Sequence, residues 1–227
     1  MEEPEIRDKC SKKSLEYHQL CIITYTCNLL QNKGGIMFIV VEGDNGVGKT
    51  TLGHYLQNEG FEFISVLPEI KNLEEAAKKN EVGSEKRFNA FLEYNRACAE
   101  LARVYPDSVV VRYWVSSVAA AYADCLLSLD EAVLKAQECL TSFSQPDIFF
   151  RLKCPRKERV TRIIQRNNEG NFSDNTSFDR ENRYSDILDV IGNDCVHFVN
   201  IDTVDNDVDG VANIVRNTIE KFKDGRY

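Results

Sequence analysis

A short glycine-rich segment carries the clearest chemistry in the sequence. Residues 43–50 are Gly-Asp-Asn-Gly-Val-Gly-Lys-Thr, which matches the phosphate-binding pattern G-x-x-x-x-G-K-[ST]. Glycines at these positions permit a tight loop whose backbone N–H groups point inward at phosphate oxygens, and a helix that begins at the loop adds its positive end. The segment follows an apolar run and opens an amphipathic one, as this chemistry requires. It predicts a site for a nucleoside triphosphate.

Individual residues of this segment suit different parts of ATP. Lys49 can reach the β- and γ-phosphates, and the Thr50 hydroxyl can bind Mg²⁺. ATP and Mg²⁺ are therefore the expected cofactors, with Thr50 as the metal ligand. The residues expected to hold the nucleotide are Gly43, Asp44, Asn45, Gly46, Val47, Gly48, Lys49, Thr50 and Thr51.

Alternating strands and helices must position these groups. From Met37 onward, apolar runs predict five strands, and amphipathic segments between them predict helices. Continuous apolar strands separated by helices indicate a parallel sheet with both faces covered. The predicted fold class is α/β, a three-layer P-loop NTPase fold with a five-stranded parallel sheet covered by helices on both faces. The expected strands are 38–42, 61–66, 108–113, 148–152 and 195–201, and the expected helices are 51–57, 84–105, 116–127, 130–143, 155–166, 179–191 and 208–222.

Such a sheet would place a second site beside the first. In a parallel sheet the loops after neighbouring strands line one crevice. Aromatic residues and arginines occur along the chain where these loops and the following helices are expected, for example Phe91, Arg96 and Arg112. A base could stack on an aromatic ring there while arginines hold its phosphate.

Composition excludes several classes of function. The formal net charge is −8 at pH 7 and the isoelectric point is near 5.1, which argues against a nucleic-acid surface or an anionic-membrane surface. No apolar run in the sequence is long enough to span a bilayer. The eight cysteines are scattered without Cys-x-x-Cys spacing, which favours reduced thiols in a cytoplasmic protein. The expected partner is a small nucleotide, with no nucleic acid and no membrane.

Five short motifs, in this order, resemble the thymidylate kinase family of nucleoside monophosphate kinases. The resemblance runs from about residue 37 to the C-terminus. It implies a homodimer that phosphorylates a nucleoside monophosphate with ATP, dTMP to dTDP in the first instance. The motifs are the loop G-x-[DN]-G-x-G-K-[ST]-T, Phe-x-x-x-Asn-Arg at 91–96, Arg-Tyr-x-x-Ser-Ser at 112–117, Pro146-Asp147 with Arg162 and Arg166, and His-Phe-Val-Asn-Ile-Asp at 197–202.

The resemblance also implies roles for residues outside the loop. Arg112 and Arg96 would contact the acceptor nucleotide, and Phe91, or else Tyr94, would stack on its base. Glu69 lies where the family has a Pro-Glu near the acceptor. The implied acceptor-binding residues are Glu69, Phe91, Asn95, Arg96, Arg112 and Tyr113.

The implied catalytic residues are Lys49, Arg112 and Arg166. Arg166 would close over the transferring phosphoryl group together with Arg180 or Arg183, because arginines stabilise charge in a reaction that depends mostly on positioning. Arg159, on the same expected helix as Arg166, is expected to face solvent.

The chain divides into an extension over residues 1–36 and a P-loop nucleotide kinase domain over residues 37–227, with a lid at about 166–180. The codons for 33–37 could form a bacterial ribosome-binding site ahead of a start codon at Met37. Residues 1–36 are therefore either an untranslated or disordered leader or a true N-terminal helix over about 14–30.

Departures from the family leave other functions open. Val111 replaces the acid before Arg-Tyr, and Asn45 replaces the acid of the loop, with Asp44 one position earlier. One alternative is a deoxynucleoside kinase, in which Glu69 would accept a proton from a 5′-hydroxyl. Another is a catalytically weakened ATP-binding module of the same fold.

Overall fold

A five-stranded parallel sheet forms the centre of the protein. The computed structural model describes residues 37–168, 178–194, 196 and 198–226, so the extension 1–36 and most of the expected lid lie outside the described residues. The strand order is β2-β3-β1-β4-β5, and every pairing is parallel. The strands are β1 (Met37–Gly43), β2 (Glu62–Phe63), β3 (Asp107–Val111), β4 (Ile148–Lys153) and β5 (Phe198–Asp202).

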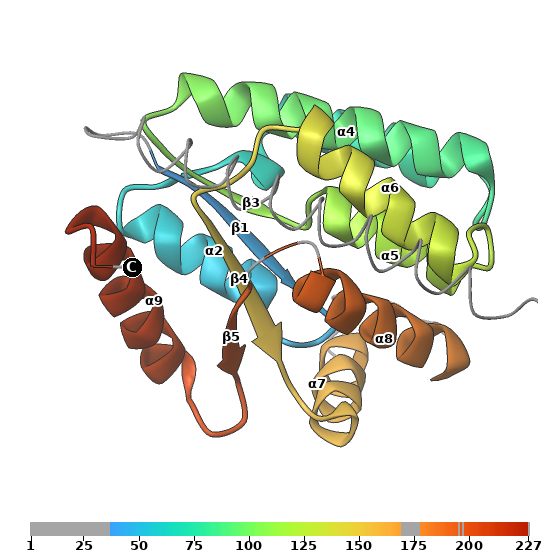
Figure 1. Cartoon of the computed structure of the whole chain (residues 1–227). Coiled ribbons are helices and arrows are strands. Elements are labelled where there is room, and N and C mark those ends of the chain that lie inside the picture. The colour runs from blue at the N-terminus through green and yellow to red at the C-terminus, as the bar shows by residue number, and fades with distance from the viewer. Residues whose placement is uncertain (1–36, 169–177, 195, 197, 227) are drawn as a thin grey trace, which may run out of the picture.

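Helices cover both faces of this sheet (Figure 1). Alternate side chains of β1 face opposite layers, so that Val40 packs in one apolar cluster and Ile39 in the other. The second cluster is closed by α2 (Lys49–Asn58) and α9 (Val208–Lys223). The first is closed by α4 (Glu85–Val104), α5 (Trp114–Ala123), α6 (Leu129–Ser142) and α8 (Phe178–Asp194). The predicted three-layer α/β architecture is confirmed.

The second strand is shorter than predicted. β2 contains only two residues, and the chain continues as a 3₁₀ turn, η1 (Ile64–Val66), and then as the helix α3 (Pro68–Lys78), which the sequence analysis did not predict. The Ser65 hydroxyl takes the place of the backbone hydrogen bonds that a longer β2 would make to β3. It accepts from Val111 N at 2.9 Å and donates to Val111 O at 3.3 Å. Pro68 opens α3, where its missing N–H costs nothing.

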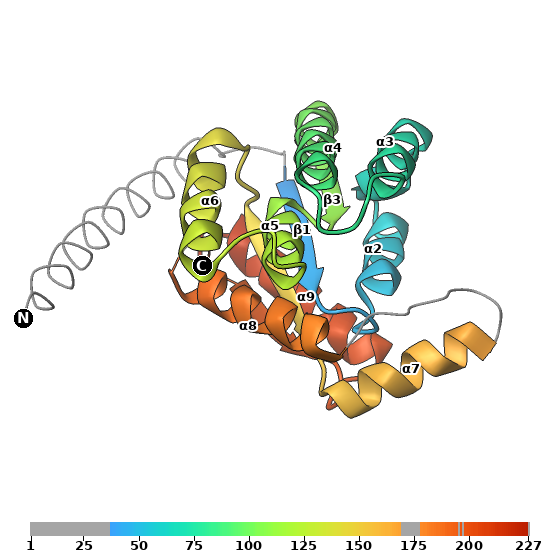
Figure 2. The same cartoon turned by 90° about the vertical axis from the view of Figure 1, so that its right-hand side faces the viewer.

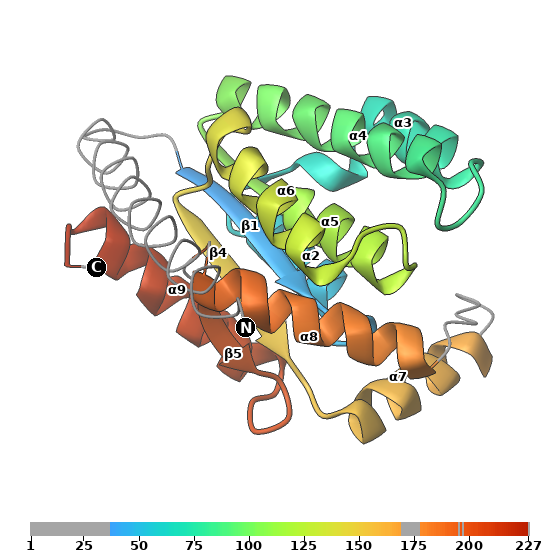
Figure 3. The same ribbon diagram turned by 45° about the vertical axis from the view of Figure 1, so that its right-hand side comes forward.

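The helix α5 lies within the monomer between α4, α6 and α8 (Figures 2 and 3). Most of its side chains are buried, including Trp114, Val115 and Val118. The family resemblance also implies that a homodimer would form through the helices expected over 84–105 and 116–127. Because α5 is buried, such a contact would rest on α4. The exposed residues of α4 are mainly charged or polar, including Lys86, Glu93 and Glu100.

The described cysteines carry free thiols. Cys98 and Cys139 are buried, Cys154 is half-buried, and Cys125 is exposed. None of the helices in the described part of the chain has the length and apolar character needed to cross a membrane.

Candidate active site

The phosphate loop joins the end of β1 to the start of α2. Gly43, Gly46 and Gly48 all have positive φ, at 136°, 82° and 96°. A Cβ at Gly43 would overlap the Leu152 carbonyl oxygen, and one at Gly46 would lie 2.9 Å from the Arg159 carbonyl oxygen. Gly48 precedes α2 without any side-chain cap, so the first-turn N–H groups are left for an external anion. The backbone therefore has the tight loop and the uncapped helix start that the motif predicts.

Lys49 is a desolvated cation within this loop. Its side chain is buried, and its Nζ donates to the Asp44 carbonyl oxygen. Burial lowers the pKa of Lys49 well below its usual value, and nearby Arg112 lowers it further, while Glu42 and Asp44 oppose the shift. A bound phosphate would favour the charged form and relieve this cost.

Arg112 brings a second cation, which is half-buried, to the same place. It follows β3 with φ at 66°, and its backbone N–H still donates to Val41 O at 3.1 Å. Its guanidinium donates to Asn45 Oδ1 in the loop and to Tyr184 Oη at 2.8 Å. Burial tends to lower its pKa, but Tyr184, Glu42 and Asp44 outweigh that effect and raise it. Arg112 therefore stays charged beside Lys49.

Glu42, directly before the loop, was not singled out from the sequence. Its carboxylate is fully buried and accepts from Tyr113 N at 2.8 Å, from Ser116 N at 3.3 Å and from the Ser116 hydroxyl. Burial raises its pKa despite these bonds. Glu42 thus fixes the first turn of α5, and its sequence signal is a single acid inside an apolar strand. Val111, where the family has an acid, packs against the apolar cluster of α2 and α9.

Two acceptor-side candidates lie together on α4. Asn95 is buried, and its Nδ2 donates to Ser117 Oγ at 2.7 Å. The Phe91 ring is half-buried, with the Arg87 guanidinium 5.4 Å from its centroid and the edge of the Tyr94 ring against it. Asn95 thus joins α4 to the first turn of α5, whose Ser116 lies 3.5 Å from the Arg112 guanidinium.

Three other candidates are placed differently. Arg96 is exposed and lies over the Phe143 ring at 5.0 Å. The Tyr113 side chain points into the core and donates to the Ser144 carbonyl oxygen at 3.0 Å. Glu69 is exposed in the first turn of α3. In this structure none of the three side chains contacts the phosphate loop.

The helix α7 (Arg156–Asn168) corrects one expectation. Arg159 was expected to face solvent, but it is only 4% exposed, and its guanidinium lies 3.3 Å from Asn45 O and 3.6 Å from Glu181. The reason is that α7 packs on the loop at Gly46. Arg162 instead donates to Thr203 Oγ1 and O, at 3.0 and 2.8 Å. Arg166 belongs to α7, but its side chain lies outside the described part.

Arg180 and Arg183, which were expected to help close the lid, contact residues at the end of α5. Arg180 forms a bidentate ion pair with Asp124. Arg183 donates to the Tyr122 carbonyl oxygen at 2.8 Å and to Cys125 Sγ at 2.7 Å. In this state they anchor the first turns of α8.

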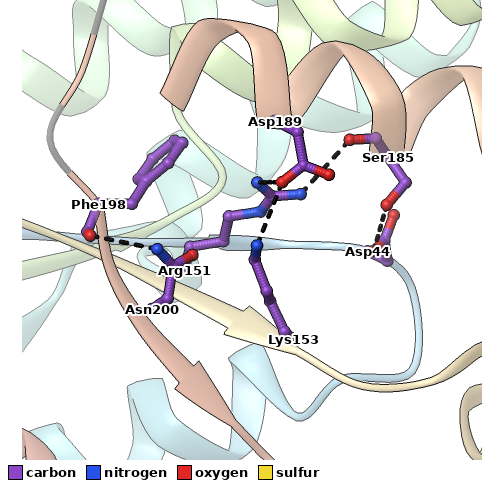
Figure 4. A network of polar contacts seen from close by, with 7 residues as sticks. All are labelled: Asp44, Arg151, Lys153, Ser185, Asp189, Phe198 and Asn200. Atoms are coloured by element: carbon purple, nitrogen blue, oxygen red, sulfur yellow. Dashed lines mark hydrogen bonds and ion pairs between the residues drawn. The ribbon is translucent and has the colours of Figure 1, made fainter. Parts of the chain in front are cut away.

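A further polar network joins α8 to β4 and the loop (Figure 4). Arg151 is buried within β4 and pairs with Asp189 of α8 at 2.6 Å, and Ser185 lies 3.3 Å from Asp44. Burial tends to raise the pKa of Asp189, but Arg151 and Lys153 outweigh it and lower that pKa. A cleft of about 240 Å³ opens here, lined by Asp44, Arg151, Lys153, Cys154, Pro155, Ser185, Asp189 and Asp202.

The metal expectation rests on Thr50 alone. Its side chain is exposed in the first turn of α2, next to Lys49. Within the described ranges, no group of three or more His, Cys, Asp or Glu residues could hold a metal. Such a donor set suits Mg²⁺, which usually keeps several waters and takes phosphate oxygens as ligands.

No protein-family model matches the sequence, and a search of curated proteins finds no match. Solved structures of similar fold exist. Thymidylate kinase from Candida albicans has a TM-score of 0.60 at 14% identity, covering 83% of this chain and 93% of that one. Deoxyadenosine kinase from M. mycoides with dCMP and a flexible dCDP has a TM-score of 0.57 at 15% identity, covering 82% of this chain and all of that one. The same enzyme with bound dATP has a TM-score of 0.58 at 14% identity, covering 81% of this chain and 100% of that one. The chain has the fold of the P-loop nucleoside and nucleoside monophosphate kinases.

Proposed function

We propose that the protein transfers the γ-phosphoryl group of ATP to a nucleoside monophosphate, with dTMP as the first acceptor to test. The observation that carries this proposal is the half-buried Arg112, whose guanidinium contacts Asn45 of the phosphate loop. An arginine there can hold an acceptor phosphate against the donor phosphates. The resemblance to thymidylate kinases supports dTMP.

The charges of the site favour a charged acceptor. Lys49, Arg112 and Arg159 are three cations at the loop, and Arg159 already lies 3.6 Å from the carboxylate of Glu181. The Arg112 guanidinium instead donates to neutral groups, including those of Asn45 and Tyr184. An anionic acceptor would give Arg112 the charged partner that a neutral nucleoside would not.

The transfer itself requires little covalent chemistry from the protein. The bond from the γ-phosphorus to the bridging oxygen breaks, and a new bond forms to an oxygen of the acceptor phosphate, giving ADP and a nucleoside diphosphate. The loop amides and Lys49 would hold the donor phosphates, and Arg112 would orient the acceptor. Mg²⁺, held by Thr50 and phosphate oxygens, would neutralise charge on the phosphates. Arg166 of the lid would add a further cation.

A deoxynucleoside kinase is the second candidate, and Glu42 is the observation that favours it. Its buried carboxyl has a raised pKa directly beside the loop, which suits a group that accepts a proton from a 5′-hydroxyl. Glu69, the base expected from the sequence, is exposed at the start of α3. The solved deoxyadenosine kinase has the same fold.

An ADP-release assay separates these candidates. The protein is given ATP, Mg²⁺ and one acceptor at a time: dTMP, dCMP, dAMP, dGMP or the matching deoxynucleosides. Turnover only with monophosphates supports the proposal, and turnover only with nucleosides supports the second candidate. If no acceptor raises ADP release while ATP still raises the melting temperature, both kinase functions are wrong and an ATP-binding module remains.

A further inference from the structure

The helix α8 binds one terminal nitrogen of the Arg112 guanidinium, and the loop binds the other. Tyr184 is buried, its hydroxyl lies 2.8 Å from the Arg112 guanidinium, and its ring centroid is 5.7 Å from the Arg112 Cζ. Arg112 thus has one contact to Asn45 in the loop, a long contact of 3.5 Å to Ser116 Oγ, and two kinds of contact to a single residue of α8. The orientation of the Arg112 guanidinium therefore depends on the position of Tyr184.

The relay of hydrogen bonds that leads from Arg112 through Tyr184 and Ser116 to Glu42 can run in only one direction. Arg112 can only donate, and an ionised Glu42 can only accept. The Ser116 hydroxyl donates to Glu42, so its oxygen accepts the Tyr184 hydroxyl proton at 2.8 Å. The lone pairs of the Tyr184 oxygen are therefore left facing Arg112. Of these hydrogen-bonded residues, only Tyr184 belongs to α8.

A second contact ties the same turn of α8 to the phosphate loop. Ser185, the next residue, lies 3.3 Å from Asp44 Oδ2 (Figure 4). The first turns of α8 are in turn fixed by the Arg180–Asp124 pair. Movement of α8 would therefore move Tyr184 relative to Arg112.

We propose that Tyr184 is a positioning residue, which orients the Arg112 guanidinium toward the phosphate loop. Turnover would then depend on the position of α8. The inference rests on the proposed function of Arg112. Tyr184 touches no reacting atom in this scheme, and it acts only through Arg112. Its hydroxyl is the part that matters, since the ring alone would leave that guanidinium nitrogen with only the longer contact of 3.5 Å to Ser116 Oγ.

The test is Tyr184→Phe, which keeps the ring and removes the hydroxyl. We expect kcat with the preferred acceptor to fall about tenfold, while the KM for ATP stays within about twofold, because a misplaced catalytic group costs rate rather than donor binding. Tyr55→Phe is the matched control, because the Tyr55 hydroxyl also accepts from an arginine, Arg216, whose Cζ is likewise 5.7 Å from the ring. That variant should keep kcat within about twofold of the parent.

A double-variant cycle separates positioning from general support. If Tyr184 acts through Arg112, Tyr184→Phe should change kcat less than about twofold in an Arg112→Lys background. A full tenfold loss in that background, or an equal loss in Tyr55→Phe, would overturn the proposal.

The cycle has a readout that needs no substrate. Melting temperatures of the parent, both single variants and the double variant report the same coupling in the ligand-free protein. The double variant should melt close to Arg112→Lys alone, and additive decreases would contradict the contact. If no acceptor supports turnover, the proposed function fails, and this melting cycle still decides whether Tyr184 holds Arg112.

Discussion

The two halves of the proposed nucleotide site are built in different ways. The proposed donor half is one continuous stretch, residues 43–51, in which glycines leave backbone N–H groups available for phosphate. The acceptor half is assembled from side chains of four elements, with Glu42 on β1, Arg112 after β3, Ser116 on α5 and Tyr184 on α8. A local motif can encode the first half. The second half exists only after the whole domain has folded, so it is more sensitive to distant changes.

The largest effect should come from Lys49→Met, which tests the donor half. Turnover should fall by about a thousandfold or more, because phosphate charge in the transition state loses its partner. The ATP-induced rise in melting temperature should shrink as well. Turnover within tenfold of the parent would contradict the assigned role.

The same variant should stabilise the ligand-free protein. Burial lowers the pKa of Lys49, so at neutral pH the folded state bears a cost for its charge. Removing the amine should raise the melting temperature at pH 7. That gain should diminish as the pH rises from the folded-state pKa toward the ordinary value of 10.5.

Arg112→Ala tests the acceptor half, with an effect that should be smaller. We expect kcat/KM for the acceptor to fall about a hundredfold, with ATP affinity unchanged within about threefold, since the guanidinium serves the acceptor phosphate. Arg96→Ala is the control, because Arg96 lies over Phe143 and should cost less than about threefold. A larger loss in Arg96→Ala would show that Arg96 contributes to acceptor binding after all.

Comparing Gly43→Ala with Gly48→Ala measures how much the close packing at Gly43 adds to the stability cost of a side chain in the loop. Both glycines have positive φ, but a Cβ at Gly43 overlaps the Leu152 carbonyl oxygen, and one at Gly48 meets nothing within 4 Å. In the ligand-free protein Gly43→Ala should cost about 2–4 kcal/mol of unfolding free energy, and Gly48→Ala about 1–2 kcal/mol. Denaturant titration gives both values. Equal costs would show that the Leu152 contact relaxes freely.

The smallest expected effect belongs to Ser65→Ala at the sheet edge. Losing its bonds to Val111 should cost about 1 kcal/mol, seen as a decrease of about 2–4 °C in melting temperature, with kcat unchanged. The control is Ser142→Ala, an exposed helix serine bonded to Glu138 O. That variant should be close to neutral.

The features that the sequence could predict are local ones, and the features that it could not predict depend on contacts between distant residues. The strands around the loop, the parallel sheet and the loop geometry followed from local periodicity and one motif. The short β2 and the helix α3 were missed because the apolar run 61–66 suits a strand and a buried turn equally well, and Ser65 decides between them through a contact 46 positions away. Arg159 was misplaced because its spacing on α7 does not reveal that α7 packs on Gly46. Tyr184 carries no local signal at all.

The two-residue strand β2 has a consequence for the behaviour of the protein at high concentration. An edge strand with free backbone groups invites strands of other molecules to add to the sheet. Here β2 offers only Glu62 and Phe63, and the Ser65 side chain occupies both the N–H and the C=O of Val111, the next positions on β3. A foreign strand would find too few partners to pair along this edge. The hydroxyl that ends the strand therefore also protects this edge of the sheet from pairing with other molecules.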